Sequence, residues 1–240
     1  QRHRVRCFDK GGGKLKKVAW ILLAVFCLTG AALAQGAMLE EDFMGDGLPR
    51  GWTVVQNLAG ELEAGGGALS LICDTTAGSA VSGLVVGTPQ FAAPRQKFAL
   101  ALEMEVPVEG AAGNKSLLYG SSPASSFFTI QAGGKLYPFG AAQGFDLPLK
   151  EAVTVRIAAD LSAGTAALWC GEALLYQGGV PGWLKAADLS RMSLSFLNMN
   201  QAAGTKSIWK LKGLKAEPFG AYAVTSSPAD GQQMADISAM

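Results

Sequence analysis

The stretch EAVTVRIAADLSAGTAALWCGEALLYQ, residues 151–177, determines the fold that we expect for this chain. Over residues 153–158, apolar side chains alternate with polar or small ones, and a period of two is typical of a half-buried strand. Residues 160–164 and Gly171 then supply two connections of hairpin length, in which glycine can adopt a positive φ. The stretch therefore predicts three antiparallel strands joined by two tight turns, with one face toward solvent.

The same alternation recurs along much of the chain. It is clearest over residues 96–106, where five apolar side chains share one face and Pro107 ends the strand because proline cannot donate to the ladder. Further short strands are predicted at 40–44, 52–56, 68–73, 81–86, 115–119, 126–131, 136–139, 192–196 and 207–216. Many short strands without an amphipathic helix, and with 31 glycines for the turns, predict an all-β fold of two packed antiparallel sheets.

The first 34 residues have the composition of an N-terminal extension followed by a secretory signal peptide. Three lysines within residues 14–17 precede an apolar run at 18–28, and the small-residue exit Ala-Leu-Ala follows at 32–34. The apolar run is too short to span a membrane. We therefore expect a signal-peptide helix that is removed before Gln35, no membrane span afterwards, and a secreted protein, extracellular or on a cell surface. An uncleaved N-terminal anchor is the alternative.

Net charge argues against nucleic acid as a partner. After residue 34 the chain holds 13 basic and 18 acidic residues, a net charge of −5, whereas nucleic-acid-binding domains present a basic patch or stripe. Four lysines do gather in and directly before the last predicted strand, and we interpret them as a solvated outer face: Lys206, Lys210, Lys212 and Lys215.

Histidine and cysteine usage restricts the chemistry. The only histidine, His3, precedes the predicted cleavage site, which excludes Ser-His-Asp and Cys-His nucleophiles and histidine-based zinc sites in the mature chain. Cys73 and Cys170 remain, and export would permit a disulfide, but the sequence does not determine whether they pair.

Several motifs together resemble the concanavalin A-like, laminin-G-type jelly rolls. Residues 43–54 and 67–71 are similar to the opening of that domain, residues 153–171 to its central meander, and residues 208–216 to its closing strand, which runs beside the first. The resemblance covers residues 39–218. It implies a two-sheet jelly-roll sandwich in an exported bacterial multi-module protein, binding carbohydrate or another cell-surface ligand.

No binding residue is transferred from the family. Many relatives carry an aspartate after the aromatic residue of the closing strand, but here Lys210 follows Trp209. The acidic loop residues of the family's calcium site have no match either. The sequence therefore predicts no metal site and no cofactor, and calcium is left open without a supporting motif.

The C-terminal tail carries a second resemblance. Residues 224–231, VTSSPADG, are similar to the first strand and turn of bacterial Ig-like modules. We therefore expect residues 219–240 to form a linker and the start of a truncated Ig-like module. The first methionine, Met38, follows the predicted cleavage site, so either translation begins at a non-Met codon, for instance near Lys14, or the chain is a fragment. The incomplete Ig-like start favours a fragment, and we expect further modules in a longer chain.

Glycoside hydrolysis is the enzymatic alternative, since it needs only two carboxylates beside the scissile bond. Jelly-roll glycosidases of the laminarinase type use E-x-D-x-x-E, and the nearest segment here places Glu103 and Glu105 on a common face. Val108 stands where the third acid belongs, and Pro107 ends the strand. We therefore interpret these two carboxylates as a solvated outer face and name no catalytic residue.

Aromatic and amide side chains in loops are the candidate ligand contacts, because an aromatic ring stacks on a sugar face while polar neighbours orient it. The candidates are Tyr119, Tyr137, Phe139, Phe145, Trp183, Asn198 and Asn200. The alternative is that the aromatics cap the ends of the sandwich core. The sequence favours a non-catalytic carbohydrate-binding or surface-ligand module, with a carboxylate-dependent hydrolase or a structural spacer as alternatives.

Overall fold

The computed structural model describes residues 38–76, 81–91, 97–108, 112–120, 122–185, 190–199 and 204–218. All of them belong to one compact unit. The predicted signal peptide, the predicted Ig-like start and the candidate Asn200 lie outside the described residues.

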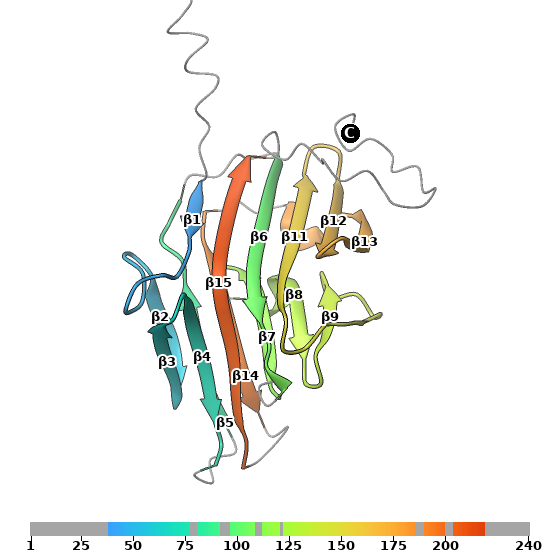
Figure 1. Ribbon diagram of the computed structural model, residues 1–240. Coiled ribbons are helices and arrows are strands. Elements are labelled where there is room, and N and C mark those ends of the chain that lie inside the picture. The colour runs from blue at the N-terminus through green and yellow to red at the C-terminus, as the bar shows by residue number, and fades with distance from the viewer. Residues whose placement is uncertain are drawn as a thin grey trace, which may run out of the picture. The chain divides into compact units, whose positions relative to one another are not determined.

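Eight strands form one antiparallel sheet around a long final strand. This strand, β15 (Lys206–Pro218), pairs with β6 (Lys97–Glu105) on one side, and with β4 (Ala68–Asp74) and β1 (Leu39–Glu41) on the other. The other members are β3 (Gly60–Gly65), outside β4, and, outward from β6, β11 (Ala152–Asp160), β12 (Thr165–Cys170) and β13 (Ala173–Gly179). This sheet lies in front in Figure 1.

Seven strands form the second antiparallel sheet, which lies behind the first in Figure 1. Their order is β10 (Phe145–Asp146), β9 (Lys135–Pro138), β8 (Ser126–Gln131), β7 (Asn114–Tyr119), β14 (Met192–Met199), β5 (Val81–Gly87) and β2 (Thr53–Leu58). The helical elements whose bounds the structure describes are the 3₁₀ turn η2 (Pro123–Ser125) and the single turn α2 (Gly182–Lys185). In this part of the chain no helix has the length and apolar character to cross a membrane. The predicted all-β jelly-roll sandwich is confirmed.

The meander of residues 151–177 folds as its alternation predicts. The strands β11, β12 and β13 are neighbours in that order, and Gly164 and Gly171 have φ values of 70° and 58°. Arg156 on β11 also donates from Nη2 to the carbonyl oxygen of Gly171 at 2.7 Å. Both turns therefore use glycine for the left-handed backbone that a side chain would strain.

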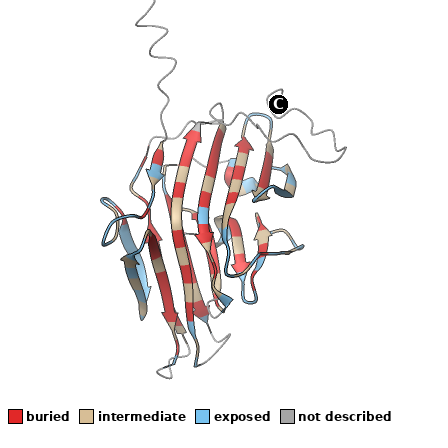
Figure 2. Ribbon diagram, in the orientation of Figure 1, coloured by how far each residue is buried: buried red, intermediate tan, exposed pale blue. Residues whose placement is uncertain are grey.

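The core lies between the two sheets and is supplied by alternate residues of their strands. On β6 the even-numbered side chains from Phe98 to Met104 are buried, and Trp209 of β15 is fully buried, with its Nε1 3.2 Å from the sulfur of Met104. Red segments along these strands are interrupted by tan ones, and on β6 also by a pale-blue one, in Figure 2. Each buried side chain of leucine size contributes roughly 1.5–3 kcal/mol by leaving water, so this face holds the sheets together.

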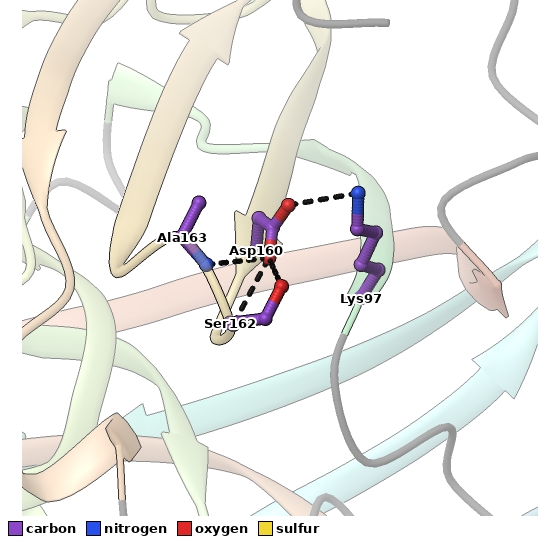
Figure 3. Close-up of polar contacts among 4 residues, drawn as sticks. All are labelled: Lys97, Asp160, Ser162 and Ala163. Carbon is purple, nitrogen blue, oxygen red and sulfur yellow. Dashed lines mark hydrogen bonds and ion pairs between the residues drawn. The ribbon is translucent and has the colours of Figure 1, made fainter. Parts of the chain in front are cut away.

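An aspartate fixes the turn between β11 and β12 (Figure 3). Asp160 Oδ1 accepts hydrogen bonds from the Ser162 backbone and hydroxyl and from the Ala163 backbone, while Oδ2 lies 2.9 Å from Lys97 Nζ. Burial disfavours the ionised carboxylate, but the turn bonds and the Lys97 ion pair outweigh burial and lower the pKa of Asp160 to about 2. This contact ties the start of β6 to the β11–β12 hairpin.

Candidate ligand-binding surfaces

Hydroxyl side chains gather on the outer face of the seven-stranded sheet. On β14, Leu194 and Phe196 belong to the core, so Ser193 and Ser195, which alternate with them, point to the opposite face. Directly paired residues share a face, which adds further members from β7, β8 and β9. We call this set the hydroxyl face: Ser116, Ser126, Thr129, Tyr137, Ser193 and Ser195.

Four members of the hydroxyl face form a row across four adjacent strands. Tyr137 on β9 lies directly opposite Thr129 on β8, Thr129 opposite Ser116 on β7, and Ser116 opposite Ser195 on β14. Ser116 Oγ and Thr129 Oγ1 are 2.9 Å apart, and Thr129 Oγ1 lies 3.4 Å from Ser126 Oγ. The row is therefore a chain of groups that both donate and accept hydrogen bonds.

The centre of the hydroxyl face is shielded from solvent. Ser116 is 9% exposed, Ser195 6% and Ser193 0%, and Ser193 Oγ is a buried hydroxyl without a hydrogen-bond partner in the described part of the chain. Gly87 lies opposite Ser193, and a Cβ there would stand 3.0 Å from Val55 and 3.6 Å from Ser193 Oγ. The missing side chain thus leaves space that Val55 of the edge strand fills.

Tyr137 ends the row as its aromatic member. The ring is half-buried, and a Cβ added at Gly144 would lie 2.6–2.9 Å from Cζ and both Cε atoms, so Gly144 packs against one face of the ring. On the same side of the sheet, Lys135 Nζ pairs with Asp146 Oδ1 at 3.1 Å, at the rim formed by β9 and β10.

Three of the other predicted aromatics meet at one end of the sandwich. Tyr119 and Trp183 stack at 6.2 Å between ring centroids, and both rings, together with Phe139, are half-buried against the core. Phe127 lies at the centre of this group, 5.3 Å from Trp183 and 6.5 Å from Phe139. The structure therefore brings these three together as a cap on the core, apart from Tyr137.

The two remaining described candidates lie elsewhere. Phe145 is half-buried on β10, opposite Leu136. Asn198 faces the core and is 0% exposed. Neither its side-chain Oδ1 nor its Nδ2 makes a hydrogen bond with a described residue. The amide of Asn198 is therefore directed into the sandwich and not toward a surface ligand.

A lysine is buried beside Asn198. Lys115 on β7 is 0% exposed, and its Nζ donates to the carbonyl oxygens of Ala112 at 2.9 Å and Gly113 at 3.3 Å. Burial disfavours the ammonium ion and lowers the pKa of Lys115 to about 7. Burial acts in the opposite direction on the thiol of nearby Cys73 and raises its pKa to about 11.

The cysteines and acids of the described residues do not form a metal centre. Cys73 is buried and Cys170 half-buried, and both are free thiols. Within the described ranges, no three His, Cys, Asp or Glu side chains come close enough to hold a metal ion.

The two carboxylates of the hydrolase alternative lie on the outer face of the eight-stranded sheet. Glu103 is exposed, whereas Glu105 forms ion pairs with Lys210 at 3.2 Å and Lys212 at 3.3 Å. Partial burial raises the pKa of Glu105, but the two lysines outweigh burial and hold that pKa below its usual value. A general acid requires a shift in the other direction.

The serines of the hydroxyl face are functional candidates that the sequence did not identify. Their alternation with core residues, as in Met-Ser-Leu-Ser-Phe at 192–196, already shows that they point outward. Serine and threonine are common on outer faces of strands, however, and only the pairing of β7 with β8 and β14 brings these together.

Comparison with known proteins identifies the fold. No protein-family model matches the sequence, and no curated protein matches it. Among solved structures, a sialidase aligns with 76% of this chain at 10% identity and a TM-score of 0.56, and the aligned region is 18% of the sialidase. The Emp47p carbohydrate recognition domain aligns over 76% of this chain and 96% of its own length, at 10% identity and a TM-score of 0.54.

A third structure, described for endo-acting O-glycanases of the human gut microbiota that initiate mucin breakdown, covers 76% of this chain and 99% of its own length. Its identity is 9% and its TM-score 0.53. These neighbours are consistent with a concanavalin A-like jelly roll, as the motifs predicted.

Proposed function

We propose that this chain is an exported, non-catalytic β-sandwich module that binds carbohydrate on the hydroxyl face. The observation that carries the proposal is the row from Tyr137 through Thr129 and Ser116 to Ser195, in which the Thr129 and Ser116 hydroxyls lie 2.9 Å apart. Hydroxyl groups on a rigid sheet can exchange donors and acceptors with the hydroxyls of a sugar. The Tyr137 ring offers an apolar surface for the C–H face of a pyranose.

Placement on strands favours this surface over the aromatic end. The backbone of a central strand is fixed by hydrogen bonds on both sides, so its outward side chains are ordered before a ligand arrives, which lowers the entropic cost of binding. Tyr119 and Trp183 are instead engaged with the core through Phe127. The similarity to a carbohydrate recognition domain and to glycan-active proteins supports the same ligand class.

A glycan array tests the proposal. The full chain should bind at least one glycan class, and the double variant Ser116→Ala, Thr129→Val should lose most of that signal because it removes two adjoining hydroxyls while nearly preserving volume. Ser70→Ala is the matched control, since Ser70 is a half-buried strand serine of β4 on the other sheet. A folded wild type that binds no glycan would contradict the proposal and favour a spacer.

A further inference from the structure

We infer that the hydroxyl face accepts an uncharged oligosaccharide that lies across the strands, from Tyr137 toward Ser195, in preference to a single sugar or an acidic glycan. This inference rests on the proposed carbohydrate-binding function and specifies the ligand for that surface.

The length of the row sets the length of the ligand. Tyr137, Thr129, Ser116 and Ser195 belong to four successive strands. Strands are spaced about 4.8 Å apart, so three intervals extend over about 14 Å. That span matches a short oligosaccharide and exceeds one pyranose ring. A monosaccharide would contact one end of the row and leave the other, largely shielded hydroxyls without a ligand partner.

The direction of the ligand follows from Tyr137. Gly144 covers one face of the ring, so only the opposite face is left for stacking, and the ring cannot rotate toward the loop without meeting the Gly144 backbone. An aromatic ring held in this way marks one terminal subsite, and the hydroxyls of Thr129 and Ser116 continue from it across β8 and β7.

The charge of the sheet selects an uncharged ligand. Over their described bounds, its seven strands contain only three charged side chains: Lys115, Lys135 and Asp146. Lys115 points into the core, and Lys135 and Asp146 neutralise each other at the rim at 3.1 Å. A carboxylate or sulfate on a sugar that lies over these strands would lose hydration without gaining an ionic partner from the strands themselves, which costs binding free energy.

Titration calorimetry on the full chain tests the inference with defined probes. These are the neutral cello-, malto-, xylo- and manno-oligosaccharides of one to four units, together with oligogalacturonates as acidic probes of equal length. In at least one neutral series, the trisaccharide should bind at least about tenfold more tightly than its monosaccharide, a difference of about 1.4 kcal/mol. Oligogalacturonates should not bind, and added calcium or chelator should not change the neutral affinity.

Two variants test the Tyr137 end and the continuation of the row, and a third is the control. Gly144→Ala must displace the Tyr137 ring, because its Cβ would stand 2.6 Å from Cζ, and should weaken the trisaccharide and the monosaccharide together. Ser116→Ala should weaken only the trisaccharide, and thus reduce the length dependence. Ser70→Ala should change neither.

Some outcomes would overturn only this inference, whereas another would contradict the proposed carbohydrate-binding function. Equal affinity for monosaccharide and trisaccharide, or binding of oligogalacturonates in preference to the neutral series, would overturn the inference and leave carbohydrate binding intact. Loss of the length dependence in Ser70→Ala would place the extended site on the other sheet and also overturn it. Absence of binding to any sugar would contradict the proposed function itself.

Discussion

The amine of Lys115 lies 4.5 Å from the centroid of the Phe196 ring, inside the sandwich, and is held there by two backbone carbonyls. Lys115 and Phe196 are directly paired residues of β7 and β14, so both point into the core. A buried ammonium ion is costly, and its carbonyl and ring contacts offset only part of that cost.

The buried Lys115 predicts a stability that rises with pH. Its pKa is about 7 in the folded chain against 10.5 for an ordinary lysine, so between these values the unfolded chain binds more protons. The free energy of unfolding should therefore increase from about pH 7 to about pH 9, with a slope of at most about 1.4 kcal/mol per pH unit. Above about pH 9 the raised pKa of the Cys73 thiol acts in the opposite direction and offsets the rise. Urea denaturation at several pH values measures it. Lys115→Met should remove the slope, and an unchanged slope in that variant would assign it to other groups.

Gly60 predicts a steric effect at the crossing between the two sheets. A Cβ at Gly60 would lie 2.8 Å from the backbone carbon and oxygen of Gly83, neither of which can move without disturbing β5. Gly60→Ala should destabilise the domain by roughly 1–3 kcal/mol, as overpacking does. Gly182→Ala is the control, because nothing lies within 4 Å of its Cβ. Equal thermal stability of the two variants would show that β3 and β5 can shift apart at Gly60 and Gly83 at little energetic cost.

Phe127 should be the most sensitive residue of the aromatic end. Its ring contacts Phe98 at 6.2 Å as well as Phe139 and Trp183. Phe127→Ala should cost about 3–5 kcal/mol and reduce the near-ultraviolet circular dichroism, because Trp183 loses its neighbour. Tyr176→Phe removes only a hydroxyl that donates to Gly179, and should cost about 1 kcal/mol. A Phe127→Ala variant as stable as Tyr176→Phe would contradict the role of Phe127.

Glu103 and Glu105 should not act in hydrolysis. The wild type should release no reducing sugar from β-glucans, and Glu103→Gln should change the free energy of unfolding by no more than about 0.5 kcal/mol. Glu105→Gln should cost more, up to about 1 kcal/mol, because it breaks the contacts with Lys210 and Lys212. Reproducible turnover that the double variant abolishes would reverse the non-catalytic assignment.

Export remains a prediction from sequence. Expressed in a bacterium with residues 1–34 intact, the protein should appear outside the cytoplasm with a new N-terminus at Gln35, which N-terminal sequencing identifies. A soluble cytoplasmic product that retains residues 1–34 would contradict the predicted signal peptide.

Local alternation was sufficient to predict most strands. Residues 96–106 and 151–177 each carry a period of two, and both form strands at the expected places, as β6 and as β11 to β13. The sequence did not reveal β3, whose only apolar side chains are Leu62 and Ala64, nor β10, which has two residues. Both are edge strands. Their extended form depends more on pairing with the neighbouring strand than on their own residue pattern.

The sequence by itself determined which side chains of each strand share a face, because that period is a local property of the backbone. It could not determine which strands become neighbours. Tyr119 and Trp183 stack although 64 positions separate them, and Ser195 meets Ser116 only through the pairing of β14 with β7. Those contacts depend on the register between strands far apart in the sequence, including the bulge between Leu117 and Leu118. That register is fixed only when both sheets bury their apolar faces together.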